Sequence, residues 1–150
     1  MPQYFAESEL PEFASFLQSP EGEYLVAELG GTVAACGGSY LREGVGRLCW
    51  GMVDQSQHGS SIGSALLARR LNHLFCQATD VHEVGIDTSQ WSSGFFERFG
   101  FRTQQVTPDG FAKGIDCVAM VLRREDWLAS ALPLRAGQAT QHRRLAAVQV

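Results

Sequence analysis

A run of small residues at 57–64, Gln-His-Gly-Ser-Ser-Ile-Gly-Ser, lies between an expected strand and an expected helix. Small side chains let the backbone approach a ligand closely, and the first turn of a helix presents N–H groups with a favourable dipole. A few charge-assisted hydrogen bonds, each worth about 1.5–3 kcal/mol, hold a diphosphate without a lysine. The run therefore predicts a phosphate or pyrophosphate site. Its expected contributors are His58, Gly59, Ser60, Ser61, Ile62, Gly63 and Ser64.

Two better-known phosphate loops do not fit this segment. No Gly-Lys-Ser/Thr follows it, which excludes a P-loop, and a dinucleotide-binding Gly-x-Gly-x-x-Gly is missing. A glycine-rich loop that caps a helix and binds nothing is a second interpretation of the same residues.

The elements around this run must position it. Strand 47–53, helix 62–78 and strand 81–88 predict a parallel crossover at the ligand. The whole order predicts an α+β fold with a mixed, mostly antiparallel central sheet and helices on both faces. The other expected elements are a helix at 9–17, strands at 24–29 and 32–40 around Gly30-Gly31, a short helix at 92–99 ended by Gly100, and strands at 101–106 and 115–122 joined by a turn around 108–110.

The composition is that of one domain and disfavours several partners. With 150 residues, 45% hydrophobic and 19% charged, we expect a single domain over 1–132 and a loose or helical tail at 133–150. A net charge of −4 argues against nucleic acid and against a polybasic membrane surface. No apolar run reaches the roughly 18 residues of a membrane span, and the start lacks a signal-peptide pattern, so we expect a cytoplasmic protein.

The cysteines point to core packing and to no metal. The chain has four, widely spaced, without a Cys-x-x-Cys pair or a histidine at zinc-ligand spacing. Three of them lie in apolar stretches, where a free cysteine behaves as a small core residue.

Two motifs together resemble the GNAT family of N-acetyltransferases. The residues 50–53, Trp-Gly-Met-Val, with the loop at 58–63 and Ser-Ala-Leu-Leu at 64–67, are similar to its acetyl-CoA signature, Arg/Gln-x-x-Gly-x-Gly/Ala at a helix start. Downstream, Phe-Phe-Glu-Arg-Phe-Gly-Phe at 95–101 is similar to the family's Phe-Tyr-x-x-x-Gly-Phe. The resemblance implies the acyl-CoA N-acyltransferase fold, acetyl-CoA as co-substrate, and direct acetyl transfer to a primary amine of a small molecule or protein.

Four positions depart from the family pattern. His58 stands where Arg or Gln is usual and Ser61 where the first Gly is usual, and both changes leave backbone N–H groups available. Ser89 stands where an Asn often supports the cofactor. Phe96 occupies the position of a tyrosine that protonates the departing thiolate, and phenylalanine cannot donate that proton.

The end of strand 47–53 is expected to meet the thioester arm. Main-chain groups of Met52 and Val53 can pair with the pantetheine arm, and an N–H there can polarise the thioester carbonyl. Gly51 inside the strand indicates either a bulge that opens the sheet or a simple kink.

The attacking amine needs a base. An alkylammonium near pKa 10.4 must lose its proton at pH 7, which costs about 4.6 kcal/mol. Asp87, near the C-terminal end of its strand, is the first candidate. Asp54 is the second, although a loop aspartate after a strand is more often a turn former, and Asp116 is the third.

Two other classes of function fit the same sequence. Phe96 and the lack of a clear base favour a catalytically weak acyl-CoA-binding sensor or interaction module. A self-associating scaffold would use Phe111, Trp127 and the tail as a dimer interface, and a homodimer is compatible with each of the other interpretations.

Overall fold

The structure, a computed structural model, describes residues 10–18, 22–54, 56, 61–77, 80–129 and 144–147. The helices are α1 (Leu10–Gln18), α2 (Ile62–Gln77), α3 (Ser93–Glu97) and α4 (Arg124–Ala129). The strands are β1 (Glu23–Leu29), β2 (Thr32–Arg42), β3 (Val45–Val53), β4 (Glu83–Thr88), β5 (Arg102–Ala112), β6 (Ile115–Arg123) and β7 (Arg144–Ala147).

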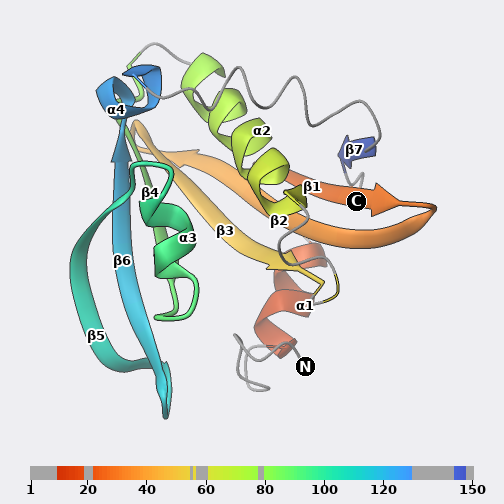
Figure 1. Ribbon diagram of the computed structural model, residues 1–150, viewed down its shortest axis with the longest axis horizontal. Coiled ribbons are helices and arrows are strands. Elements are labelled where there is room, and N and C mark those ends of the chain that lie inside the picture. Colours follow the sequence, from red (N-terminus) through yellow and green to blue (C-terminus); the bar gives the residue numbers. More distant parts are fainter. Residues whose placement is uncertain are drawn as a thin grey trace.

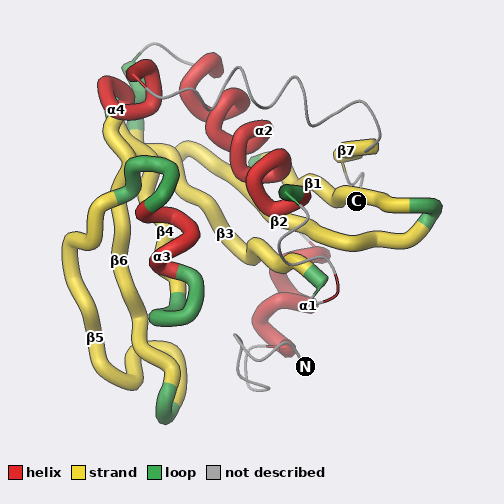
Figure 2. Tube along the Cα trace, viewed as in Figure 1, coloured by secondary structure: helices red, strands yellow, loops and turns green. Residues whose placement is uncertain are grey.

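These strands form one sheet in the order β5-β6-β4-β3-β2-β1-β7 (Figure 1). The only parallel pair in this sheet is β3 with β4, and the other neighbours run antiparallel. Helix α2 makes the crossover between the two parallel strands (Figure 2). The prediction of a mixed, mostly antiparallel sheet with one parallel crossover is confirmed.

Two hairpin turns connect β1, β2 and β3, and the first lies at the predicted Gly30-Gly31. Gly30 and Gly31 adopt φ values of 58° and 82°, and Glu43 and Gly44 adopt 54° and 78°. Two successive residues at positive φ match the twist of the flanking strands, which explains the short connections of the β1–β2–β3 meander.

The predicted turn around 108–110 is wrong, because the β5–β6 turn lies at Lys113–Gly114. The Asp109 carboxylate accepts a hydrogen bond from Gly114 N at 2.7 Å, and Asp116 accepts one from Asp109 N at 3.0 Å. These side chains stabilise an irregular stretch inside β5, where the register shifts between Thr107 and Ala112. The chain therefore turns only at Gly114, whose φ of 79° suits glycine.

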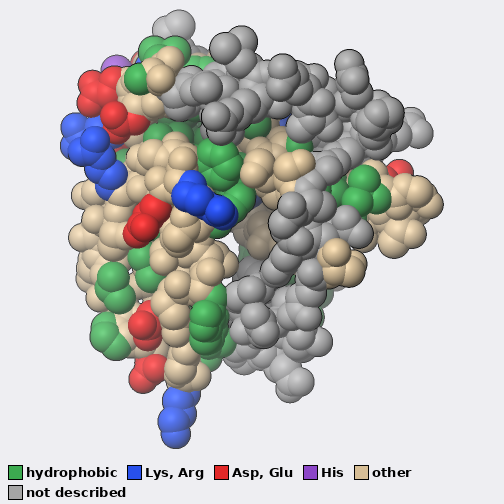
Figure 3. Space-filling model, viewed as in Figure 1, with side chains coloured by type: hydrophobic (Ala, Val, Ile, Leu, Met, Phe, Trp, Pro, Cys, Tyr) green, Lys and Arg blue, Asp and Glu red, His purple; other side chains and the backbone are tan. Residues whose placement is uncertain are grey.

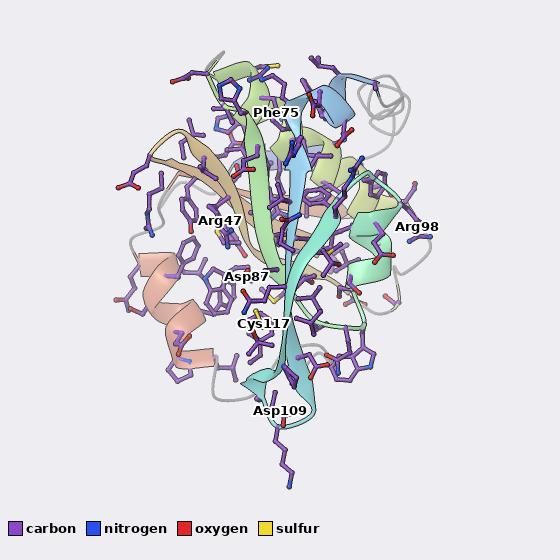
Figure 4. All side chains as sticks on the ribbon, turned by 90° about the vertical axis from the view of Figure 1, so that its left-hand side faces the viewer. Arg47, Phe75, Asp87, Arg98, Asp109 and Cys117 are labelled. Carbon is purple, nitrogen blue, oxygen red and sulfur yellow. The ribbon has the colours of Figure 1, made fainter. Side chains whose placement is uncertain are left out.

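Helices cover both faces of the sheet, as predicted. Figure 4 shows α1 on one side and α2, α3 and α4 on the other. On the α2 side, Leu67, Leu71 and Leu74 pack into a core with β4 and β6, and Trp127 of α4 stacks on Phe75 at 4.7 Å between ring centroids. Trp127 is buried in this core and so has little surface to offer the expected scaffold interface, whose other parts, Phe111 and the tail, stay a prediction.

The contacts on the opposite face are aromatic. Phe13 and Phe16 of α1 lie over Tyr24 and Trp50, with ring centroids 5.1–6.3 Å apart. None of the side chains of α1 is fully buried. This helix is thus held by a few ring contacts rather than by a continuous core.

The tail at 133–150, expected to be loose or helical, contains a strand instead at the four residues that the structure describes. Arg144–Ala147 pair antiparallel with β1, from Leu25 to Glu28. An edge strand such as β1 presents unpaired main-chain groups, and pairing with β7 satisfies them.

Candidate functional site

The sheet opens between its two parallel strands. β3 and β4 pair only at Gly46 with Val84 and at Arg47 with Gly85, near the N-terminal ends of both strands. Beyond these pairs the strands diverge (Figure 1). An opening at the carboxyl ends of parallel strands is a common place for a ligand in α/β folds.

A β-bulge in β3 lies beside this opening. The β2–β3 register passes from Gly38 opposite Cys49 to Cys36 opposite Met52, so that β3 holds one extra residue. Trp50, inside this step, has a φ of 45°. Of the two interpretations of the glycine that follows it, the bulge is the one observed, and such bulges bend a strand and increase its local twist.

The N-terminus of α2 forms one wall of the opening. A Cβ on Gly63 would lie 3.5 Å from Val53 Cγ2 and 3.7 Å from Phe95 Cζ, so the end of β3, the first turn of α2 and α3 meet at this glycine. Ile62 is fully buried, whereas Gly63 and Ser64 are half-buried. The loop contributors His58, Gly59 and Ser60 lie outside the described residues.

Ser61 shows why a glycine is usual at its position. Its φ is 64°, in the left-handed region, and its carbonyl accepts the first hydrogen bond of α2 from Ala65 N at 3.0 Å. A non-glycine residue in this region costs roughly 1–2 kcal/mol. The backbone bend at the start of the helix is therefore kept although the glycine is not.

The two residues expected beside the cofactor from the resemblance occupy different surroundings. Phe96 is 8% exposed and packs edge-on against Phe95 and Phe101 in the main core. Ser89, directly after β4, is buried, and its Oγ has no hydrogen-bond partner among the described residues. An orphaned buried hydroxyl at the mouth of an opening suits a ligand that carries amide groups, because leaving it unpaired is costly.

Met52 and Val53 are half-buried at the diverging end of β3, where the resemblance implies contact with the ligand. Tyr24 fixes the bulge just before them, its hydroxyl donating to Trp50 O at 3.1 Å. Burial, and next the contact with Cys36, raise the pKa of Tyr24 above its usual range, so the hydroxyl remains a donor. The bulge is thus held from the α1 side by a protonated phenol.

Asp87 lies on the α1 side of the opening. Its Oδ2 accepts a hydrogen bond from Arg47 Nη2 at 3.2 Å, and both side chains are partly exposed. Figure 4 shows Arg47, Asp87 and Cys117 close together on the side of the sheet that faces α1. Burial, and next the charge of Asp87, raise the pKa of the Cys117 thiol. Continuing the β3–β4 register places Asp87 level with Cys49, where the strands have already separated.

The other two aspartates have local hydrogen bonds. Asp54 Oδ1 accepts from Ser56 N at 2.8 Å and from Ser56 Oγ at 2.6 Å, which stabilises the start of the loop before α2. Asp116 accepts from Asp109 N in the β5–β6 hairpin. Of the three expected candidates, Asp87 is the one that lies on β4, beyond its last pair with β3.

Three side chains near the opening were not among the site residues expected from sequence: Arg47, Arg70 and Phe95. Each lies against a glycine of a neighbouring element, because a Cβ on Gly85 would collide with Arg47, and one on Gly63 would touch Phe95. Glycine inside a strand marks a close approach. Such glycines were the available signal, although sequence alone does not tell which side chain approaches them.

The described residues contain no group of three or more side chains able to hold a metal ion. Among the helices that the structure describes, none has the length and apolar character needed to cross a membrane. On the face seen in Figure 3, the coloured basic and acidic side chains are interspersed rather than gathered by sign.

Known structures share this fold. A protein described as a GNAT-family acetyltransferase from Desulfovibrio desulfuricans superimposes with a TM-score of 0.64 at 23% identity, covering 81% of this chain and 85% of that one. A Bacillus subtilis acetyltransferase in complex with CoA gives 0.63 at 16% identity, covering 79% and 86%. The IAA acetyltransferase of Bacillus cereus gives 0.63 at 17% identity, covering 79% and 87%.

Among curated protein sequences, none matches the chain. The family model for the acetyltransferase (GNAT) domain matches residues 4–124, which include β3, the bulge, α2 and β4. Because that match spans most of the 150 residues, the chain belongs to the GNAT acetyltransferase family.

Proposed function

We propose that the protein is an acetyl-CoA-dependent N-acetyltransferase that transfers the acetyl group directly to a primary amine of a small molecule or protein. The observation that carries this proposal is the opening between β3 and β4, bordered by the bulge and by the glycine wall at the start of α2. The CoA complex of the structurally similar Bacillus subtilis acetyltransferase supports it.

The cofactor enters from the α2 side. Backbone N–H groups of 58–64 receive the pyrophosphate at the helix N-terminus, where the dipole favours an anion. Main-chain groups of Met52 and Val53 pair with the pantetheine arm, and Ser89 Oγ gains the partner that it lacks. Gly63, which carries no side chain, lets the arm pass close to the helix start beside Val53 and Phe95.

The acceptor amine enters from the α1 side and reacts directly, without a covalent enzyme intermediate. Its nitrogen attacks the thioester carbonyl carbon to form a tetrahedral intermediate, which collapses as the carbon–sulfur bond breaks. CoA leaves as a thiolate, and the second proton of the nitrogen passes to solvent. Asp87, directly or through a water, takes the proton that the ammonium must lose. Arg47 orients that carboxylate with the 3.2 Å hydrogen bond, while Asp54 is the alternative base only if the loop carrying it rearranges.

The departing thiolate receives no proton from Phe96, which has no hydroxyl group. Solvent must therefore protonate it after it leaves the core of the site. The same observation favours a second candidate function, an acyl-CoA-binding sensor or interaction module with little turnover. The two functions share the cofactor site and differ in acetyl transfer.

Calorimetric titration with acetyl-CoA, followed by thiol release across a panel of amines, tests both functions. Binding with thiol release on one or more amines supports the enzyme, and binding without release on any amine supports the sensor. Gly63→Trp places an indole at the junction of Val53 and Phe95 and abolishes binding, whereas Thr103→Trp on the exposed β5 leaves it intact. Unchanged affinity in Gly63→Trp would refute the site.

The assembly and the location of the protein belong to the same proposal. We place it in the cytoplasm, where acetyl-CoA is available to it, as a monomer or a homodimer. Light scattering coupled to size-exclusion chromatography gives the oligomeric state directly.

A further inference from the structure

Arg70 of α2 is buried against the sheet behind the bulge. Only 3% of the surface of Arg70 is exposed. Nε and Nη2 donate to Gly38 O at 3.1 Å and 2.8 Å, and Nη2 also donates to Cys49 O at 3.1 Å. Gly38 and Cys49 are the register pair that adjoins the bulge, so one guanidinium joins both strands at this point.

Retaining a cation there has a cost. Burial lowers the pKa of Arg70 to about 10, against the opposing effects of Cys49, Tyr24 and Cys36. The group therefore stays charged at pH 7. Within the described part of the chain, none of the groups that act on its charge is a carboxylate. A buried ion without a counter-ion loses much of its solvation, and hydrogen bonds to carbonyls offset only part of that loss.

The sheet is shaped to receive this side chain. A Cβ on Gly37 would lie 2.8 Å from Arg70 Cζ, and one on Gly51 would lie 3.1 Å from Nη1. Glycines on two adjacent strands thus leave the space in which the guanidinium lies. One of them, Gly51, is one of the two β3 residues that the bulge places opposite a single residue of β2.

We infer that Arg70 is a positioning residue that holds the β3 bulge in place and thereby sets the opening that admits the acyl-CoA arm. This inference rests on the proposed function. Arg70 acts through Met52 and Val53, which follow the bulge and whose main-chain groups must face the arm. Tyr24 holds the bulge from the opposite face, so the strand is clamped from both sides.

A purely structural role for Arg70 makes a different prediction. If the side chain only fills space, methionine of similar length replaces it with no desolvation cost, and stability is unchanged or higher. If it holds the bulge, the same substitution weakens cofactor binding while the fold remains intact. Stability and affinity therefore move apart in Arg70→Met.

Arg124, the first residue of α4, offers a matched control because it bonds main-chain carbonyls near the C-terminal end of α2. Its Nε donates to Val81 O at 2.6 Å and its Nη2 to Phe75 O at 2.8 Å, so it is also a guanidinium bound to main-chain carbonyls. We expect Arg70→Met to raise the dissociation constant for CoA about tenfold or more, and Arg124→Met to leave it within about twofold. Urea unfolding of Arg70→Met gives a midpoint equal to or above that of the wild type. Wild-type CoA affinity in Arg70→Met overturns the inference.

Gly37→Ala keeps the inference testable if Arg70→Met fails to fold. It displaces the guanidinium from β2, a strand that does not border the opening, and we expect it to weaken CoA binding about threefold or more. In Arg70→Met the added methyl has no guanidinium to displace, so the double variant binds CoA no more weakly than Arg70→Met. Wild-type affinity in Gly37→Ala contradicts the inference.

Amide hydrogen exchange separates this inference from the proposed function, because it needs no ligand. Residues 49–53 should exchange about tenfold faster in Arg70→Met and at the wild-type rate in Arg124→Met. A wild-type protein that binds no CoA refutes the proposed function, and the exchange rates then decide by themselves whether Arg70 holds the bulge. Equal exchange in both variants refutes that role.

Discussion

Strand β4 has two neighbours that it meets in different ways. With β6 it forms six consecutive antiparallel pairs, from Glu83 with Arg123 to Thr88 with Val118. With β3 it forms two parallel pairs and then separates. The closed boundary thus uses the full length of β4, whereas the open one uses only its beginning.

The difference lies in what fills each boundary. Leu122 of β6 is fully buried in the core, and a Cβ on Gly100 would lie 3.2 Å from its Cδ1. Along the open boundary, Met52 and Val53 are only half-buried, and glycines face the charged side chains Arg47 and Arg70. The closed side of β4 thus adjoins the apolar core, whereas the other side adjoins half-buried and charged residues.

The largest effect is expected for Asp87, the proposed base at the open boundary. Asp87→Asn keeps the size of the side chain and a hydrogen-bond acceptor for Arg47, but it cannot take the proton from the acceptor amine. General-base catalysis contributes roughly 10²–10⁴-fold, so kcat should fall by about that factor. Steady-state kinetics measure kcat, and calorimetry should show an unchanged CoA affinity.

Asp116→Asn is the matched control, since Asp116 lies in the β5–β6 hairpin with its carboxylate on Asp109 N. It should leave kcat within about twofold of the wild type. If Asp87→Asn behaves like this control, Asp87 is not the base.

A pair of alanine substitutions separates the two boundaries. Leu122→Ala leaves a cavity in the closed one and should lower the free energy of unfolding by about 2–5 kcal/mol. Val53→Ala, at the half-buried open end of β3, should cost less than about 1.5 kcal/mol but weaken CoA binding. Urea unfolding and calorimetry give the two quantities.

The comparison fails if both variants lose stability and affinity together. That result would mean that the opening is packed like the rest of the core, so that stability and cofactor binding depend on the same contacts.

Much of this arrangement follows from local sequence patterns. Paired residues at Gly30-Gly31 fixed a turn whose geometry needs positive φ, and the apolar spacing of α2 placed the crossover. The joint motifs around Gly63 and Gly100 gave the family. These features depend on neighbours in the chain, which is why spacing reveals them.

Contacts between distant segments were not predictable in the same way. The β5–β6 turn lies at Gly114 rather than at 108–110 because Asp109 N donates to the Asp116 carboxylate across the hairpin and Gly114 N donates to the Asp109 carboxylate. No local sequence pattern indicates these hydrogen bonds. Arg70 is another example, because an arginine on a helix is usually solvated and only the fold brings Gly37 and Gly51 beside it. The side chains that the sequence did not reveal are those that contact a glycine of another element.

The smallest expected effect concerns the backbone at the start of α2. Ser61 has a φ of 64°, so Ser61→Gly should relieve roughly 1–2 kcal/mol of backbone strain in the folded state. Glycine also makes the unfolded chain more flexible, which lowers stability by roughly 0.5–1 kcal/mol. The net gain in unfolding free energy should be about 0.5–1 kcal/mol, measured by urea titration. Ser64→Gly, inside the helix, should instead lose about 0.5–1 kcal/mol.

The CoA affinity of Ser61→Gly shows whether the backbone or the hydroxyl of Ser61 contacts the cofactor. The proposed donors to the pyrophosphate are backbone N–H groups, which Ser61→Gly retains in the same left-handed bend. Calorimetry should therefore give an affinity within about twofold of the wild type. A loss of affinity without a loss of stability would show that the Ser61 hydroxyl itself binds the cofactor, and the open boundary would then be held to its ligand by a side chain as well as by the backbone.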